Sequence, residues 1–575
     1  KDLVPCQVIS PRNSLLPLFF LLCAYFYNGC AGELPPSGGP VDTVPPRIIA
    51  TFPEPNTVGF SGSKVILEFD EYVEEQSVEG SVFISPFLGL LEFDWSGRQV
   101  QIRFAEKLRP TTTYVVNVGT DVVDIRNRNR MDRAFSLAFS TGASIDSGSI
   151  SGRVFDNQPE GVMVFAYRLD SLSSRLLDPS IEKPHYITQT GKGGSFSLTH
   201  LSLGPYRLFA VRDEYKNLLY DTGVDEVGMY RGDVALDSAH PSFGGVDFQL
   251  TKEDTTRPQL FSASALDQQH VVLRFSKPLD PNRFTSRTNV VVDTLSGERL
   301  GTRDGFVDLQ NPSSLVLLTS DQKPQIGYRI TVDSLFDTTG NVISQKMNSA
   351  VFQGAGAPDT SSPEVIYISV RDSARQVPLD ARLECRFNDI VRRQNISQAF
   401  LLLDSTGSAV KATFRWKTSA AFEFVPATEL RSKEWYQIRL PLSAVVDLAG
   451  NHGKESLLVR RFETIDKNQM GSIEGEVVDE TGSKRRAPVI VRASEVRQKE
   501  RAVYEVRLPE AGKFQMSRIV EGSYVVSGFR DDDHDGKFSI GKPFPFQSSE
   551  VFAFYPDTVR VRARWPVQGV VIRLR

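Results

Sequence analysis

The stretch RDDDHDGKFSIG, residues 530–541, holds the residues of this chain that are best suited to chemistry. Asp531, Asp533 and Asp535 occupy alternate positions, and Gly536 follows the third of them. This spacing lets a tight loop direct alternate carboxylates at one hard cation such as Ca²⁺. The twelfth position of an EF-hand loop would be Lys542, which cannot supply the bidentate carboxylate. The stretch therefore predicts a calcium loop inside another fold, or else a solvated acidic turn.

A second loop of the same kind, RDEYKNLLYDTG, lies at residues 212–223. It keeps Asp213 and Asn217, but Tyr215 stands where the middle acid would be. A loop that recurs without its full set of acids favours a structural role in its domain. Both interpretations of the 531–535 loop stay open at this point.

The pattern of the other reactive residues argues against an enzyme. No two histidines form a His-Glu-x-x-His pair, and neither a Gly-x-Ser-x-Gly turn nor a Cys/His arrangement occurs. We therefore predict a protein that is not an enzyme and that needs no cofactor beyond a structural Ca²⁺. A hydrolase with an unrecognised pair of carboxylates stays open as an alternative, because acids are abundant and the sequence does not give their geometry.

A basic stripe lies close to the end of the sequence given. Arg560, Arg562 and Arg564 alternate with apolar residues across 559–565. In a strand, this spacing of two places all three guanidinium groups on one face of the sheet. The stripe predicts either a contact with an acidic partner or lipid phosphates, or a solvated outer face.

An apolar run near the start indicates where the protein is sent. Residues 15–27 are thirteen apolar or weakly polar residues, whereas a bilayer span needs roughly twenty. Arg12 precedes the run and the small Gly29 ends it, which is typical of a secretory signal. Cys30 follows in YNGC, a sequence that resembles a bacterial lipobox. We predict a lipoprotein signal peptide over 1–29 and lipidation of Cys30; the alternative is a plain signal peptide cleaved elsewhere.

The segment that follows Cys30 fits a tether. Residues 30–46 are rich in Pro and Gly and show no apolar period. A diacylglyceryl group together with an amide-linked acyl chain would supply more than the two signals that stable anchoring needs.

Bulk composition bounds the remaining possibilities. The chain has 575 residues, of which 40% are hydrophobic and 24% charged, so it is long enough for several globular domains. Its net charge of −4 gives no basic field that would attract nucleic acid. Cys385 is the only cysteine beyond the N-terminal segment, and its strand-like surroundings predict a buried small side chain.

Beyond residue 44 the sequence predicts strands almost everywhere. Short runs that alternate apolar and polar residues, such as KVILEFD (64–70), HVVLRFS (270–276) and YRITVDS (328–334), are separated by turns of Gly, Pro, Asn and Asp. This pattern predicts an all-β chain built as a tandem array of antiparallel β-sandwich domains.

One type of module, here called B, occurs twice. GSISGRVFD (148–156) matches GSIEGEVVD (471–479) at six of nine positions. Downstream, the segment 194–213 matches 512–531 without a gap. We expect Phe196 of the first copy to face inward.

A second type of module, here called A, occurs three times. Each copy opens near a proline-bearing linker, continues with a strand that ends in Phe, and later has a strand headed by Tyr and then an Asp turn. The turns DTTGN (337–341) and DLAGN (447–451) carry residues that favour left-handed φ.

The repeats divide the chain into five modules in the order A-B-A-A-B, joined by short linkers that favour a semi-rigid rod. The predicted ranges are A1 at 47–143, B1 at 147–252, A2 at 255–356, A3 at 360–466 and B2 at 469–575.

Two families are suggested by these motifs. The A modules, with VILEFDE, RLECRFND and DLAGN, resemble bacterial Ig-like domains of the S-layer-protein type, and the B modules resemble carboxypeptidase-regulatory, prealbumin-like sandwiches. A lipobox followed by PPSGGPVDTVPPRI and such modules is similar to cell-surface Ig-like lipoproteins of Bacteroidota. The resemblance implies a lipoprotein of the outer membrane that faces the cell surface; a periplasmic orientation stays open.

This resemblance implies a scaffold or binding subunit, as in accessory parts of outer-membrane assembly or secretion complexes, with an envelope protein as partner. A glycan-binding or adhesion protein is the alternative. The first predicts an apolar patch that spans modules, and the second predicts exposed aromatic side chains in one groove.

Overall fold

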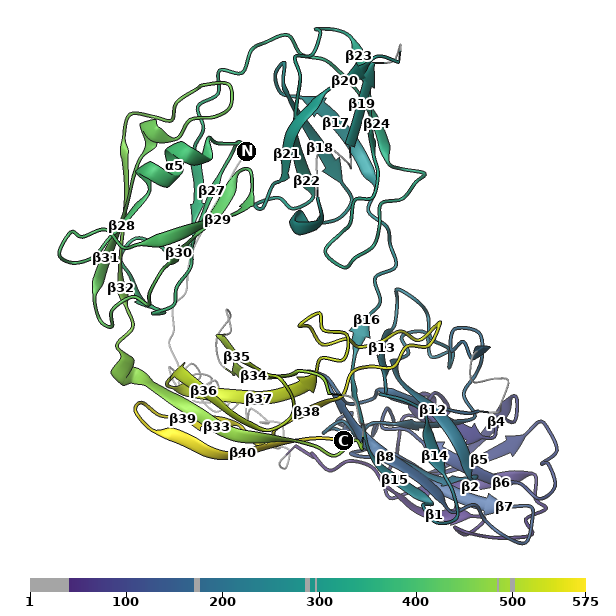
Figure 1. Cartoon of the computed structure of the whole chain (residues 1–575). Coiled ribbons are helices and arrows are strands. Elements are labelled where there is room, and N and C mark those ends of the chain that lie inside the picture. The colour runs from purple at the N-terminus through teal and green to yellow at the C-terminus, as the bar shows by residue number, and fades with distance from the viewer. Residues whose placement is uncertain (1–40, 170–175, 285–289, 295–296, 483–485, 497–501) are drawn as a thin grey trace, which may run out of the picture.

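The computed structural model describes residues 41–575 apart from 170–175, 285–289, 295–296, 483–485 and 497–501. Strands make up almost all of its regular structure, which confirms the predicted all-β class (Figure 1). The predicted signal peptide and Cys30 lie outside the described residues. Within the described part of the chain, no helix has both the length and the apolar character that crossing a bilayer requires.

The three A modules share one construction, in which two sheets enclose an apolar core. Along β2, for example, Val65, Leu67 and Phe69 are fully buried and alternate with partly exposed neighbours. The sheets of A1 have the strand orders β1-β2-β5-β4 and β3-β6-β7; those of A2 are β17-β18-β22-β21 and β20-β19-β23-β24; those of A3 are β25-β27-β30-β29 and β26-β32-β31-β28.

The elements of A1 are β1 (Ile48–Phe52), β2 (Lys64–Phe69), α2 (Glu75–Glu79), β3 (Val82–Ser85), β4 (Leu91–Ser96), β5 (Gln99–Phe104), β6 (Thr113–Val118) and β7 (Phe135–Ser140). Those of A2 are β17 (Leu260–Ala265), β18 (His270–Phe275), η1 (Pro281–Arg283), β19 (Val290–Thr294), β20 (Arg299–Leu300), β21 (Thr302–Val307), β22 (Ser314–Thr319), β23 (Gly327–Val332) and β24 (Ser349–Gln353). Those of A3 are β25 (Val365–Ile368), β26 (Ala374–Val377), β27 (Leu383–Phe387), α5 (Arg393–Ala399), β28 (Leu401–Leu403), β29 (Ala412–Thr418), β30 (Ala421–Pro426), β31 (Trp435–Pro441), η2 (Leu442–Ala444) and β32 (Leu457–Thr464).

The two B modules pair a three-stranded sheet with a larger one. The sheet orders are β11-β8-β15 and β10-β9-β12-β13-β16 in B1, and β36-β33-β40 and β35-β34-β37-β38 in B2; β14 and β39 add to β12 and β37. The strands of B1 are β8 (Gly148–Phe155), β9 (Met163–Arg168), β10 (Tyr186–Gln189), β11 (Ser195–Leu201), β12 (Gly204–Arg212), β13 (Glu226–Met229), β14 (Val234–Leu236), β15 (Ser242–Gln249) and β16 (Thr251–Lys252). After η3 (Lys467–Gln469), those of B2 are β33 (Met470–Asp479), β34 (Val489–Glu495), β35 (Val503–Leu508), β36 (Lys513–Val520), β37 (Gly522–Arg530), β38 (Phe552–Phe554), β39 (Val559–Val561) and β40 (Pro566–Leu574).

Three strand pairs depart from the expected antiparallel arrangement. Strand β8 pairs in parallel with β15, β33 with β40, and β26 with β32. Parallel partners need a long connection, and in the B modules the pair joins the first strand to a strand at the far end of the module. The sequence repeats carried no information on the direction in which these strands pair.

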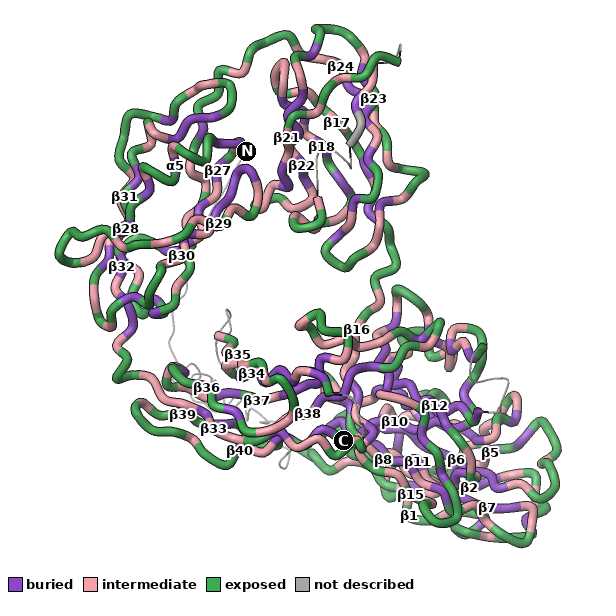
Figure 2. Tube along the Cα trace, viewed as in Figure 1, coloured by how far each residue is buried: buried purple, intermediate pink, exposed green. Residues whose placement is uncertain are grey.

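Each module has its own buried apolar cluster, with exposed loops around it (Figure 2). Phe196 is buried in B1, as expected. Cys385 is fully buried in β27, and this burial raises the pKa of its thiol. The prediction of a buried cysteine is therefore confirmed.

The tyrosines that head the late strands of the A modules tie each sheet to the preceding loop. The hydroxyl groups of Tyr114, Tyr328 and Tyr436 each accept a hydrogen bond of 2.8 Å from the backbone N–H five residues earlier. In the B modules, the Tyr206 and Tyr524 hydroxyls donate to the carbonyl four residues earlier. All five rings are buried, so each bond fixes a loop to the core.

We expect Tyr436→Phe to destabilise A3 by about 1–3 kcal/mol, because the N–H of Arg431 would lose its acceptor while the ring stays in place. Hydrogen exchange of the amides in β31 and β32 measures this locally, which avoids assuming two-state unfolding in a multidomain chain. Tyr72→Phe, at a side chain that is 60% exposed, is the control and should leave exchange unchanged.

The chain closes on itself instead of forming the expected rod. B1, A2, A3 and B2 follow one another around a ring, and A1 lies beside B1 (Figure 1). The ring of Phe155 in B1 stacks on that of Phe554 in B2, with 4.8 Å between centroids, and meets Phe552 edge-on at 5.8 Å. Phe546 of B2 reaches Phe209 of B1 at 5.9 Å. These apolar contacts join residues that are 337 to 399 positions apart in sequence, which the linker composition could not predict.

Candidate functional site

The aspartates of the predicted calcium loop lie together in the turn after β37. One carboxylate oxygen from each of Asp531, Asp533 and Asp535 lies within 4.8 Å of the other two. Asp531 is fully buried, and its Oδ2 accepts hydrogen bonds from Arg507 Nη2 at 2.8 Å and from the Gly536 N–H at 3.2 Å. Its Oδ1 accepts none. A buried carboxylate oxygen without a donor is costly, so the residues present fit a hard cation.

In the corresponding loop of B1, backbone N–H groups of the loop itself supply the hydrogen bonds that the carboxylates need. Both carboxylate oxygens of Asp213, the counterpart of Asp531, accept backbone N–H groups, from Asn217 at 3.2 Å and Leu218 at 2.8 Å. Asp225 is also fully buried there, and both of its oxygens accept backbone N–H groups. The two loops therefore share a position but differ in how their carboxylates are satisfied.

We expect Ca²⁺ to protect the B2 loop from trypsin after the exposed Lys537, because an ion held by the three aspartates would rigidify the loop. Asp533→Asn should abolish this protection. The measurement is the rate of cleavage, followed by mass spectrometry with and without Ca²⁺. Cleavage after Lys216 in the B1 loop is the internal control and should not respond; equal protection at both lysines would contradict a specific site.

The basic stripe is only partly what the alternation predicted. Arg560, Arg562 and Arg564 are all exposed. Arg560 lies in β39 between the buried Val559 and Val561, as a two-residue period requires. Arg564, however, has a φ of +65° and lies in a turn beyond the strand, so the regular alternation ends before it.

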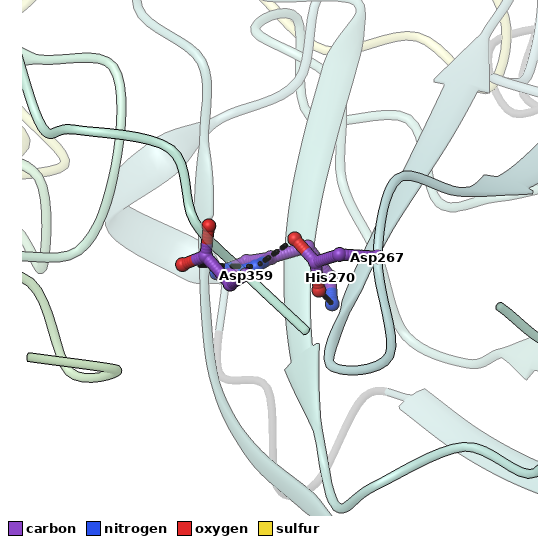
Figure 3. A group of neighbouring side chains, drawn as sticks. All are labelled: Asp267, His270 and Asp359. Atoms are coloured by element: carbon purple, nitrogen blue, oxygen red, sulfur yellow. Dashed lines mark hydrogen bonds and ion pairs between the residues drawn. The ribbon is translucent and has the colours of Figure 1, made fainter. Parts of the chain in front are cut away.

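A second group of titratable side chains lies between A2 and A3 (Figure 3). His270 begins β18, and its Nδ1 lies 2.8 Å from Asp267 Oδ2 in the preceding hairpin turn and 4.0 Å from Asp359 Oδ2 in the linker. Its Nε2 lies 3.3 Å from Asp389 Oδ1, at the end of β27 in A3. One imidazole thus contacts a hairpin of A2, the linker and A3.

The charge of His270 follows from these neighbours. Burial alone would lower the pKa of His270, but the hydrogen bonds and negative charges of Asp389 and Asp267 raise it to about 9. The neighbouring carboxylates therefore favour the protonated form of the ring. Beside it, Ser419 Oγ of A3 donates to Asp304 Oδ2 of A2 at 2.7 Å, and Phe306 and Ile390 belong to one apolar cluster across the same junction.

The sequence did not single out this junction, because its residues come from separate stretches of two modules. One signal was present: the motif Asp-Thr-x-x-Pro opens each A module, at Asp42, Asp254 and Asp359.

Comparisons with known proteins bear on the fold. Residues 42–141 and 359–464 match the family model of the bacterial Ig-like domain, which confirms the resemblance for A1 and A3. A comparison with curated proteins finds no match.

Solved structures give low similarity over parts of the chain. The N-terminal part of the bacterial S-layer protein SbsC is 15% identical with a TM-score of 0.16, over 36% of this chain and 44% of that one. SbsC domains 1–6 are 8% identical with a TM-score of 0.16, over 91% of this chain and 67% of that one. L,D-transpeptidase 1 of Mycobacterium tuberculosis is 12% identical with a TM-score of 0.17, over 37% of this chain and 88% of that one.

Proposed function

We propose that this protein is a lipid-anchored, non-enzymatic scaffold at the surface of the bacterial outer membrane, where it holds an envelope protein. The observation that supports this most is the packing of B2 on B1. A tether requires only length. A scaffold requires its modules to hold fixed relative positions, which the packing of B2 on B1 would provide. The bacterial Ig-like domains in A1 and A3 and the lipobox-like sequence before Cys30 support the surface location.

The edge of B2 that carries the basic stripe is the surface we propose for the partner. Trp565 is 70% exposed and follows Arg564 in the turn after β39. An exposed indole beside guanidinium groups is typical of protein interfaces, where Trp and Arg are enriched. An acidic surface with an apolar pocket would complement it.

The test is affinity purification of the full chain from outer membranes in mild detergent, followed by mass spectrometry. A membrane protein recovered in stoichiometric amount would support the scaffold, and its loss with Arg562→Glu and Trp565→Ala would locate the contact. Recovery of the free protein alone would contradict the proposal. Arg303→Glu, which makes the same charge change in A2, is the matched control.

A further inference from the structure

Each A module brings three residues to the same place, where its linker enters. They are an aspartate of the linker, the residue two positions after the Phe that ends a core strand, and the aspartate of the later turn. The sets are Asp42, Glu71 and Asp124 in A1, Asp254, Lys277 and Asp337 in A2, and Asp359, Asp389 and Asp447 in A3.

Two structural details show that these sets are equivalent. In every copy, a residue close to the end of the core strand forms a β-bridge with the turn aspartate. This residue lies two positions after Glu71, Lys277 or Asp389. The pairs are Val73–Asp124, Leu279–Asp337 and Val391–Asp447. In every copy, an asparagine side chain of the turn donates to the backbone carbonyl of the linker aspartate; the donors are Asn129, Asn341 and Asn451. The three modules thus share one frame and differ in the side chains that meet inside it.

In A2 the frame encloses a cation that the chain itself supplies. The ammonium group of Lys277 donates to Oδ2 of Asp254 and, at 2.7 Å, to Oδ2 of Asp337. It also donates to the carbonyl of Thr256 at 2.7 Å. One ammonium group therefore pairs with both carboxylates without an external ion.

In A3 the residue equivalent to Lys277 is Asp389, so a third carboxylate replaces the lysine side chain. Oxygens of Asp359, Asp389 and Asp447 all lie within 4.8 Å of one another. Asp447 is 1% exposed and the Asp359 side chain 3% exposed. Oδ1 of Asp359 accepts the Ser361 N–H at 2.9 Å, but Oδ2, the oxygen that binds Lys277 in the Asp254 equivalent, accepts no hydrogen bond.

The protein's own positive charges do not balance this group. The His270 ring contacts Asp389 and Asp359 from one side, but it also pairs with Asp267, so a single side chain is shared by three carboxylates. Arg392 Nε donates to the backbone carbonyl of Asp447 at 3.0 Å. Among the described residues, the carboxylate of Asp447 accepts hydrogen bonds only from the neutral donors Gly450 and Asn451.

We propose that Asp359, Asp389 and Asp447 bind a Ca²⁺ ion at the junction of A2 and A3, in the place that the Lys277 ammonium takes in A2. Three carboxylates are the donor set that a hard divalent cation prefers, and water can complete the six to eight oxygens of its shell. Because Asp359 belongs to the linker, the ion would join the linker to A3. The geometry of the A2–A3 junction, and with it the ring, would then depend on calcium.

The test exploits the natural difference between A2 and A3. Calcium binding is measured by titration calorimetry on the full chain after EDTA treatment, with Asp533→Asn and Asp535→Asn in every variant to silence the B2 loop. Asp389→Lys should remove one bound Ca²⁺, because its ammonium would occupy the site as Lys277 does in A2. The reciprocal change Lys277→Asp should add one, because it recreates the three-carboxylate set in A2.

Two further variants control for charge and for folding. Asp557→Lys makes the same charge change as Asp389→Lys at an exposed position of B2 and should bind calcium like the parent. Asp447→Asn keeps the shape of the side chain and should weaken binding on the order of tenfold or more, because it removes one charged ligand. In EDTA, Asp389→Lys should unfold at a temperature no lower than the parent, which would show that its loss of binding is not loss of fold.

Either of two results would overturn the inference. One is a parent that binds no Ca²⁺ once the B2 loop is silenced, which would mean that the three carboxylates need no ion besides their contacts with His270. The other is an Asp389→Lys variant that retains the full number of bound ions. Neither result depends on a membrane anchor or a protein partner, so the proposed function would stand in both cases.

Discussion

Phe155→Asp should open the ring and increase the radius of gyration of residues 31–575 in small-angle X-ray scattering. Phe155 is only partly buried and packs on B2 through Phe552 and Phe554, so its loss should leave B1 folded. The change removes part of the about 1.5–3 kcal/mol that full burial of a Phe side chain contributes. It also places a carboxylate against the aromatic rings of Phe552 and Phe554.

Phe155 is central to one of the apolar clusters that join B1 to B2. B1 and B2 are connected only through A2 and A3, so their contact competes with the entropy of an open arrangement of the modules. Phe261→Asp is the matched control, since Phe261 is 61% exposed on A2. A scattering profile that is identical for both variants would show that Phe155 does not hold the ring closed.

Cys30→Ser should release the protein from the membrane almost completely. If Cys30 carries the lipid, no other anchor is predicted, and each buried CH₂ of the lost acyl chains contributes about 0.8 kcal/mol to membrane binding. Phase separation in a cloud-point detergent should move the protein from the detergent-rich to the aqueous phase. Incorporation of radiolabelled palmitate should be lost together with this partitioning.

The neighbouring cysteine gives a matched control. Cys23 lies within the predicted signal peptide, so Cys23→Ser should change neither partitioning nor labelling of the mature protein. Retention of Cys30→Ser in the detergent phase would refute lipidation at this residue. The folded modules would be unaffected, so this experiment tests the anchor alone.

The candidate sites differ in how far the sequence could predict them. The loop at 531–535 was visible because its three aspartates are two residues apart, and a short loop must bring such neighbours together. The site in A3 was not visible, because Asp359, Asp389 and Asp447 are separated by 30 and 58 residues. Only the pairing of Val391 with Asp447 and the bond from Asn451 to Asp359 bring them into one place.

The amino-acid sequence by itself was sufficient for the all-β class, and its repeats predicted five modules and their order. A period of two decides which side chains of a strand face the core, and Asp-x-x-Gly-Asn turns need only local bonds, as in the Asp447 Oδ1 that accepts the Asn451 N–H at 2.8 Å. These features depend on residues a few positions apart, so local sequence is sufficient for them.

The tertiary structure alone decided the parallel pairing of β8 with β15, the closure of B2 on B1 and the meeting of carboxylates at the A2–A3 junction. Each of these three features joins residues that are far apart in the chain. The contact between those residues depends on the packing of whole modules. A composition of short, proline-bearing linkers limits how far modules can separate, but it does not set the angle between them. That angle follows from which apolar and charged surfaces fit each other once the modules have folded.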